Sequence, residues 1–376
     1  MTKHLAILAL VAAVAACDST RSATEPQASV LAGAHSEGKL GPRAVYTITN
    51  QVAGNAVAVF TRAGNGTLTP AGTYTTGGTG TGAGLGSQGA VTLSRDGRLV
   101  FAVNAGSNDV SVLRVESNGL SLLSRTPSGG TLPTSVTVSG NVVYVLNAGG
   151  AGTITGFTLT DGGELTPIAG STKSLSGSAT APAQVSFSPN GRQLIVAERA
   201  TNLLDVYPVD ADGMAGERAS FASSGGTPFG FAFGLRNELF VSEAAAPGST
   251  SSYVLGKGGD LSVVSGAVLT HQGAPCWLVV TNDGRFAYTG NGAGSVTGFS
   301  IVPGGSIRLL DADGATAIVN AGVNDIALSR HSGYLYALGT GDTPAIHAFR
   351  VQPDGQLQPL GPVAGLPAGT RGLAAF

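Results

Sequence analysis

One apolar position recurs along most of the chain at intervals of 45 to 49 residues. Each occurrence follows a Pro- or Gly-containing tetrapeptide and opens a short apolar run. A period in the forties without a helical pattern is typical of propeller blades rather than of helical solenoids. The recurring residues are Val91, Val136, Val185, Phe231, Leu278, Ile326 and Leu373.

Within each repeat, short apolar runs alternate with turn signals. Pairs such as Asp96-Gly97 and Asp283-Gly284 predict tight hairpins, because their residues tolerate positive φ. Four runs per repeat predict four antiparallel strands. Only 11% of the residues are charged, as expected where neighbouring sheets cover both faces of the inner strands.

The two ends of the repeat region complete each other. Residues 45–76 contain only the second to fourth strands of a unit, and residues 371–376 contain only a first strand. Pairing them would close the ring and protect an exposed sheet edge. Residues 44–376 are therefore predicted to form an all-β, seven-bladed β-propeller that the C-terminal strand closes.

The first seventeen residues have the pattern of an export signal. A basic start precedes an apolar run from Leu5 to Val14, and small residues lead to Cys17. This order resembles the bacterial lipobox, so residues 1–17 are predicted to be a lipoprotein signal with Cys17 lipidated; the alternative is a plain signal peptide. Residues 18–43 would then be a flexible linker. The expected location is the bacterial cell envelope, periplasmic or surface, with the membrane as partner through Cys17.

Several function classes are disfavoured. A net charge of −2 with no basic run argues against nucleic acid as a partner. The segment 84–89 matches GxGxxG, but no helix follows it, so a dinucleotide site is not expected. Neither a metal-ligand pattern nor any other cofactor motif occurs, and no cofactor is predicted. The chain is expected to be a monomer.

A polar residue ends the second strand in most repeats, where the loops of a propeller mouth should lie. Asn50 and the pair Gly339-Thr340 hold this position in the two remaining repeats. We expect a polar ring around one mouth that binds a small molecule or an envelope protein. The alternative for the asparagines is that they bond their own loops. The five clear cases are Asn104, Asn147, Glu198, Glu243 and Asn291.

Two of these residues carry the catalytic hypothesis. Glu198 and Glu243 lie on neighbouring blades and could face one space, where one carboxylate would raise the pKa of the other for acid–base work. The alternative is that both are solvated or paired with arginine, and Arg199 is adjacent. Gln184, Arg199 and Trp277 are further ligand-binding candidates. Trp277 could stack on a ligand ring or instead fill the core between blades.

Residues 196–202, 228–233, 240–244 and 274–285 resemble the lactonase-like seven-bladed propellers, which include 6-phosphogluconolactonases and carboxymuconate-lactonizing enzymes. The resemblance covers residues 44–376. It implies a site built from a Glu at the end of a second strand, matched by Glu198, together with His and Arg. The family's His follows a proline at the start of a first strand, where this chain has Thr134, Ala183, Phe229 or Cys276.

These observations leave the function open between two main classes. The first is an exported lactonase-like hydrolase or isomerase that acts on a small lactone at the channel mouth. The second is a non-catalytic propeller of the cell envelope that binds a small molecule or a protein, and a purely structural surface protein is a third reading. Whether the chain is an enzyme is not decided by its sequence.

Overall fold

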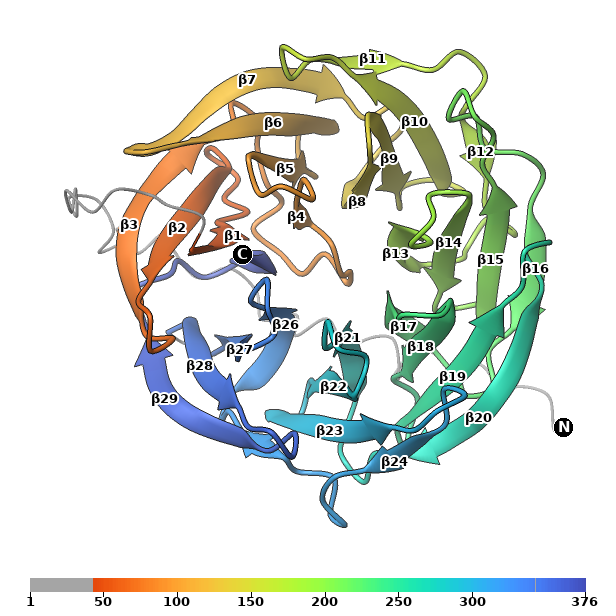
Figure 1. Cartoon of the computed structure of the whole chain (residues 1–376). Coiled ribbons are helices and arrows are strands. Elements are labelled where there is room, and N and C mark those ends of the chain that lie inside the picture. The colour runs from red at the N-terminus through yellow and green to blue at the C-terminus, as the bar shows by residue number, and fades with distance from the viewer. Residues whose placement is uncertain (1–42, 342) are drawn as a thin grey trace, which may run out of the picture.

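The computed structural model describes residues 43–341 and 343–376, where all regular structure is β-strand. The strands form seven antiparallel sheets arranged in a ring (Figure 1), as predicted. The predicted signal sequence, Cys17 and nearly all of the linker lie outside the described residues.

We number the blades 1 to 7 along the chain and give their strands from the centre of the ring outward. Blade 1 is β4 (Val91–Leu93), β5 (Leu99–Asn104), β6 (Asp109–Glu116) and β7 (Gly119–Pro127). Blade 2 is β8 (Pro133–Ser139), β9 (Val142–Asn147), β10 (Thr153–Leu159) and β11 (Leu165–Pro167), with β12 (Lys173–Ser174) also on β10. Blade 3 is β13 (Pro182–Phe187), β14 (Gln193–Glu198), β15 (Leu203–Pro208) and β16 (Ala219–Ala222).

The remaining blades repeat this order. Blade 4 is β17 (Pro228–Phe233), β18 (Glu238–Glu243), β19 (Ser249–Leu255) and β20 (Leu261–Leu269). Blade 5 is β21 (Pro275–Val280), β22 (Phe286–Asn291), β23 (Ser295–Ile301) and β24 (Ile307–Leu309), with β25 (Ala317–Ile318) also on β23. Blade 6 is β26 (Gly322–Leu328), β27 (Tyr334–Thr340), β28 (Ala345–Val351) and β29 (Leu357–Val363).

Blade 7 joins the two ends of the propeller, in the order β30 (Arg371–Ala375), β1 (Ala44–Ile48), β2 (Ala56–Arg62) and β3 (Leu68–Thr75). Val45 pairs with Ala375 in the register, and the Phe376 amide donates to the Ala44 carbonyl at 3.0 Å. The predicted closure by the C-terminal strand is confirmed.

The ring has two different faces. The bottom face carries the hairpins that join first to second and third to fourth strands. The top face carries the ends of the second strands and the connections that lead from one blade to the next. Middle strands are buried over most of their length, and β14 over all of it, because a neighbouring blade covers each side. A polar side chain in such a strand must therefore find its hydrogen bonds inside the protein.

Candidate functional site

The polar residues that end the second strands are enclosed within their blades. Asn104, Asn147, Glu198, Glu243 and Asn291 are all at most 1% exposed. Four of them bond the top-face connection that leads into their own blade, whereas Asn291 bonds Ser295 and Thr297 of the adjacent β23. Asn104 Oδ1 accepts from Thr76 Oγ1 at 2.7 Å, and Asn147 Nδ2 donates to the Ser128 carbonyl at 3.2 Å. In this structure the five side chains are therefore buried and bonded to the protein itself.

The two blades that lack a clear member of this series also have a polar side chain here that bonds the protein itself. In blade 7, Asn50 Nδ2 donates to the Gly369 carbonyl at 3.2 Å, in the connection before β30. In blade 6, Thr340 Oγ1 donates to the Gly322 carbonyl at 2.9 Å. The repeated polar position therefore reflects a repeated loop-anchoring geometry, which the sequence alone could not separate from a ligand-binding ring.

Glu243 is the most completely hydrogen-bonded of these anchors. Its Oε1 accepts from Ser223 Oγ at 2.8 Å, from the Gly225 amide at 2.7 Å and from Ser251 Oγ at 2.7 Å. Its Oε2 accepts from Ser249 Oγ at 2.6 Å. Both carboxylate oxygens of Glu243 thus accept from neutral donors of blade 4 and of the connection that leads into it.

A second position of the repeat pairs with the anchor from the adjacent third strand. In four blades a hydroxyl residue holds it and contacts or lies within hydrogen-bond reach of the anchor's side chain; these are Ser111, Thr155, Ser251 and Thr297. In blade 3 the same position is Asp205, and it faces Glu198. Blade 3 therefore places two carboxyl groups where these four blades place one polar group and one hydroxyl.

Glu198 and Asp205 are both fully buried and hydrogen-bond each other. Asp205 also accepts from Ser220 Oγ at 2.6 Å and lies 3.3 Å from Arg218 Nη1. Glu198 accepts from the Ser176 amide at 2.8 Å and from Thr201 Oγ1 at 2.5 Å. Two carboxylates in contact cannot both ionise readily, so the pair retains a proton.

Burial, followed by the hydrogen bond with Glu198, raises the pKa of Asp205 to about 7, and the lowering contributions of Ser220 and Arg218 do not offset this. Burial also acts to raise the pKa of Glu198, but the hydrogen bonds from Asp205, Ser176 and Thr201 lower it below its usual range. The proton belongs to the pair rather than to one residue. The pair thus exchanges a proton near neutral pH.

Glu198 is the last residue of β14 and lies directly beneath the top-face loops. Ser176 is half-buried and Thr201 is exposed, and both cover Glu198 from top-face loops. Asp205 lies deeper, on the middle of the blade. Asp205 is not among the site residues predicted from the sequence. An alignment of the repeats contains the signal, because four of them have Ser or Thr at this position.

The structure does not bring Glu198 and Glu243 together. Among the described residues they share no hydrogen-bond partner, and each is enclosed by its own blade. The predicted common space between them is therefore corrected, and the carboxyl partner of Glu198 is Asp205. Arg199 Nε donates to the Ala181 carbonyl at 2.9 Å, and its guanidinium lies 5.4 Å from the centre of the Phe229 ring.

The other candidates on the first strands contact the protein itself. Gln184 is 7% exposed and bonds the backbone of Phe231 on the next blade, accepting at 2.7 Å and donating at 3.1 Å. Trp277 is 1% exposed, packs edge-on against Phe229 with ring centres 5.3 Å apart, and donates to the Ser87 carbonyl at 3.0 Å. Trp277 therefore fills the core between blades, which is the alternative to stacking on a ligand ring.

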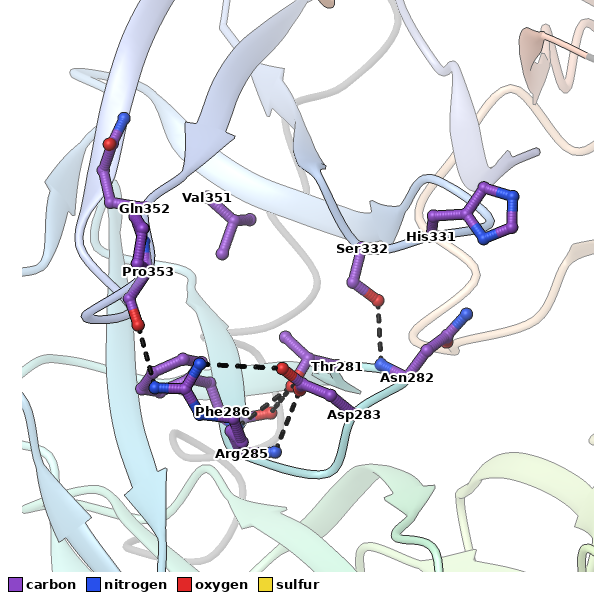
Figure 2. Close-up of a pocket in the computed structure, with 10 residues that line it drawn as sticks. All are labelled: Thr281, Asn282, Asp283, Arg285, Phe286, His331, Ser332, Val351, Gln352 and Pro353. Atoms are coloured by element: carbon purple, nitrogen blue, oxygen red, sulfur yellow. Dashed lines mark hydrogen bonds and ion pairs between the residues drawn. The ribbon is translucent and has the colours of Figure 1, made fainter.

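A hollow lies on the opposite, bottom face. It measures 470 Å³, and Figure 2 shows its ten lining residues between the hairpins of blades 5 and 6. Its polar groups bind one another: Arg285 Nη2 donates to the Pro353 carbonyl at 2.9 Å, and the Asn282 amide donates to Ser332 Oγ at 2.8 Å. None of the predicted site residues lines it.

Two general features complete the description of residues 43–341 and 343–376. No three His, Cys, Asp or Glu side chains come together there as a metal site would require. Nor does this part of the chain include a helix long and apolar enough to cross a membrane.

Comparison with known proteins adds the family. The model of the family "Lactonase, 7-bladed beta-propeller" matches residues 43–172 and 133–230, which together span half of the chain. The chain belongs to the seven-bladed lactonase family. No curated protein sequence matches this lactonase-family propeller.

Solved structures share the fold at low sequence identity. A Lactobacillus plantarum protein has a TM-score of 0.74 at 16% identity, over 90% of this chain and all (100%) of its own. The periplasmic gluconolactonase of Pseudomonas aeruginosa has a TM-score of 0.70 at 18% identity, over 87% and 98% of the two chains. A candidate 6-phosphogluconolactonase from Bacteroides fragilis has a TM-score of 0.71 at 17% identity, over 89% and 98%.

Proposed function

We propose that this lactonase-family propeller hydrolyses a small lactone, with the Glu198–Asp205 pair moving the protons. Membership of the family supports the reaction class. The Glu198–Asp205 pair supports the location of the site. Four other blades place a hydroxyl residue beside the anchor, and blade 3 places Asp205 there. A hydroxyl residue at position 205 would be enough for loop anchoring. An acid at this position is therefore better explained by a role in proton transfer.

The pKa of Asp205, about 7, suits the chemistry. A group that exchanges its proton near the working pH serves well as both base and acid. In its ionised form the pair takes a proton from the attacking water through Glu198, and the resulting hydroxide adds to the lactone carbonyl. As the ring C–O bond breaks, the same proton passes to the leaving ring oxygen. One water is consumed, one hydroxy acid forms, and the pair returns to its starting state.

Glu198 is the member of the pair that substrate would touch. Access requires the hydroxyls of Ser176 and Thr201 to move aside, and both belong to top-face loops. Asp205 acts through Glu198 and sets its protonation. We assign Glu243, Asn104 and Asn147 to anchoring, because they bond the loops that lead into their blades, and Asn291 to bonding within blade 5.

A second candidate is the non-catalytic envelope propeller. It is favoured by the full burial of Glu198 and Glu243, which leaves neither of these carboxylates open at the top face. On this reading the Glu198–Asp205 pair is an anchor like the others, and the top loops bind a neutral small molecule or a protein.

A comparison of variants separates the two. The purified full chain is assayed on a panel of aldonolactones and simple lactones beside Glu198→Gln, Asp205→Ser and Glu243→Gln. Asp205→Ser recreates the Glu–Ser arrangement of blade 4 and should fold. We expect turnover by the wild type, a loss of roughly 100-fold or more in Glu198→Gln and Asp205→Ser, and near-normal turnover in Glu243→Gln if it folds.

The remaining outcomes decide against the pair or against catalysis. Full activity in folded Asp205→Ser would remove the pair from the mechanism. The absence of turnover on every lactone by a folded wild-type protein would favour the binding propeller.

We further propose that the chain is exported and held in the cell envelope by lipid on Cys17, as the lipobox pattern indicates. Several acyl chains on one residue anchor a protein stably, whereas one chain binds weakly. The described part begins with Arg43 at the bottom face, where its carbonyl accepts from the Arg62 amide at 2.9 Å. A tether that leaves from this face would turn the top face away from the membrane.

Expression in a bacterial host with radioactive palmitate tests the anchor. We expect label on the wild-type chain, recovery of that chain in the membrane fraction, and neither in Cys17→Ala. Equal membrane recovery of both chains without label would contradict lipid anchoring.

A further inference from the structure

The connection before β4 is much longer than its counterparts. Fifteen residues, 76–90, separate β3 from β4, whereas five residues separate β7 from β8, β16 from β17 and β20 from β21. In Figure 1 this orange segment leaves the ring of blades and reaches into its middle. Its inner part, residues 84–89, is called the strap below. It is the GxGxxG-like segment for which no nucleotide role is expected.

The strap bonds three first strands besides its own blade. The Gln88 amide donates to the Ala183 carbonyl of blade 3 at 3.0 Å, and the Val136 amide of blade 2 donates to the Gly89 carbonyl at 2.9 Å. Ser87 Oγ donates to the Thr134 carbonyl at 2.8 Å. On the far side, Trp277 Nε1 of blade 5 donates to the Ser87 carbonyl at 3.0 Å. Strands on both sides of the ring axis therefore share one segment.

Gln88 makes a contact that other blades make with their own first strands. In blade 3, the side-chain amide of Gln184 both accepts from and donates to the backbone of Phe231 on blade 4. The corresponding position on blade 4 is Gly230. There, Gln88 Oε1 accepts from the Leu278 amide at 2.9 Å and Gln88 Nε2 donates to the Leu278 carbonyl at 2.8 Å.

The reason for this exchange is space. A Cβ at position 230 would lie 2.6 Å from the Cys276 carbonyl oxygen and 2.9 Å from the Leu278 nitrogen, both backbone atoms of β21. No side chain fits there, so blade 4 cannot supply the contact itself. The same Cβ would lie 2.1 Å from Gln88 Oε1, which shows that the glutamine occupies the volume left by the glycine.

We infer that the strap is a fixed brace across the axis, in which Gln88 supplies to blade 5 the backbone contact that Gly230 cannot. The brace closes the top end of the central opening with the chain's own backbone. Its energetic reason is that the Leu278 amide and carbonyl would otherwise be buried without these partners, which is unfavourable for backbone polar groups. Ligands then reach the top face over the blades rather than through the centre of the ring.

The chain provides its own probe and its own control. Trp277 is the only tryptophan and donates its indole proton to the strap, so its fluorescence reports the position of the strap. Gln184→Ala removes the same kind of paired contact, between blades 3 and 4, without touching the strap. Gln88→Ala removes it from the strap, and Gln88→Glu keeps the acceptor but not the donor.

In the full chain, we expect acrylamide quenching of Trp277 to rise at least twofold in Gln88→Ala, by less in Gln88→Glu, and not in Gln184→Ala. Unchanged quenching in Gln88→Ala, or an equal rise in Gln184→Ala, would overturn the inference. The wild type gives a test that needs no variant. A fixed brace requires the Leu278 and Phe231 amides to exchange hydrogen at the same global-unfolding rate. Faster exchange of Leu278 alone would show a strap that opens as a lid, and would contradict the brace.

Discussion

At the scale of single residues, the repeats act as controls for one another. The same anchor position is Asn in some blades and Glu in others, and the partner position is Ser, Thr or Asp. In the proposed function, the difference between a structural and a chemical role therefore depends on one substitution, Asp205 for a hydroxyl residue, rather than on the presence of a glutamate. The repeat pattern marks the anchor position, but Glu198 and Glu243 look alike there. What separates them is the residue on the adjacent third strand, Asp205 or Ser251.

Removal of the Glu243 side chain should destabilise the protein strongly. Glu243→Ala leaves the Gly225 amide and several buried hydroxyls without their acceptor, at about 1–3 kcal/mol for each unsatisfied group. We expect a loss of about 3 kcal/mol or more in the free energy of unfolding, measured in urea. Glu217→Ala, at a side chain that is 98% exposed, is the control and should change it by less than about 0.5 kcal/mol. A loss in Glu243→Ala as small as in this control would contradict the anchoring role.

The carboxyl pair should make stability depend on pH. The pKa of Asp205 is raised to about 7 in the folded protein and is near 4 in the unfolded chain, so the folded state binds more protons between about pH 4 and 7. Stability should therefore fall as pH rises through this window, by up to about 1.4 kcal/mol per pH unit from this group. The lowered pKa of Glu198 acts in the opposite sense, but only below about pH 4.

Urea unfolding at pH 5 and pH 7.5 measures this slope. Burial also raises the pKa of Asp325, which adds a slope of the same sign, so the informative quantity is the difference between the wild type and Asp205→Ser. We expect the variant to have the shallower dependence. Identical slopes in the two proteins would mean that Asp205 does not hold a proton in the folded state.

At the scale of elements, the blade pattern was predictable and the strap was not. Turn pairs such as Asp96-Gly97 mark hairpins locally: Gly97 has φ of +72°, and a Cβ there would lie 2.5 Å from the Phe376 ring. The course of residues 84–89 depends instead on a vacancy at Gly230, far away in sequence. Nothing local to either segment indicates that they meet.

The C-terminal strand should be essential, because β30 is the inner strand of blade 7. Deletion of residues 371–376 exposes the edge of β1 and removes the buried Leu373. We expect the shortened chain to lose cooperative thermal unfolding, measured by circular dichroism. Addition of a peptide of residues 371–376 should restore part of it, whereas the same peptide with Leu373→Asp should not. A shortened chain that unfolds like the wild type would contradict closure by this strand.

At the scale of the whole molecule, the ring closes through the inner strand β30, whereas the proposed site lies on β14 and β15 of blade 3. The repeat spacing and the two partial end units were enough to predict seven blades, because each blade is only stable against its neighbours. The site could not be predicted to the same depth. Middle strands are covered on both faces, so their polarity pattern does not tell whether a side chain points to a neighbouring loop, to another acid or to a ligand.

The most direct test of the account is a carbon-13 titration of the Asp and Glu carboxyl groups by nuclear magnetic resonance, in the wild type and in Asp205→Ser. The account predicts a carboxyl signal that titrates near pH 7 and is absent from the variant, since the remaining Glu198 would then have a hydroxyl neighbour like Glu243. A wild-type spectrum in which every carboxyl signal that differs from the variant titrates below pH 5 would contradict a shared proton, and with it the proposed chemistry of the pair.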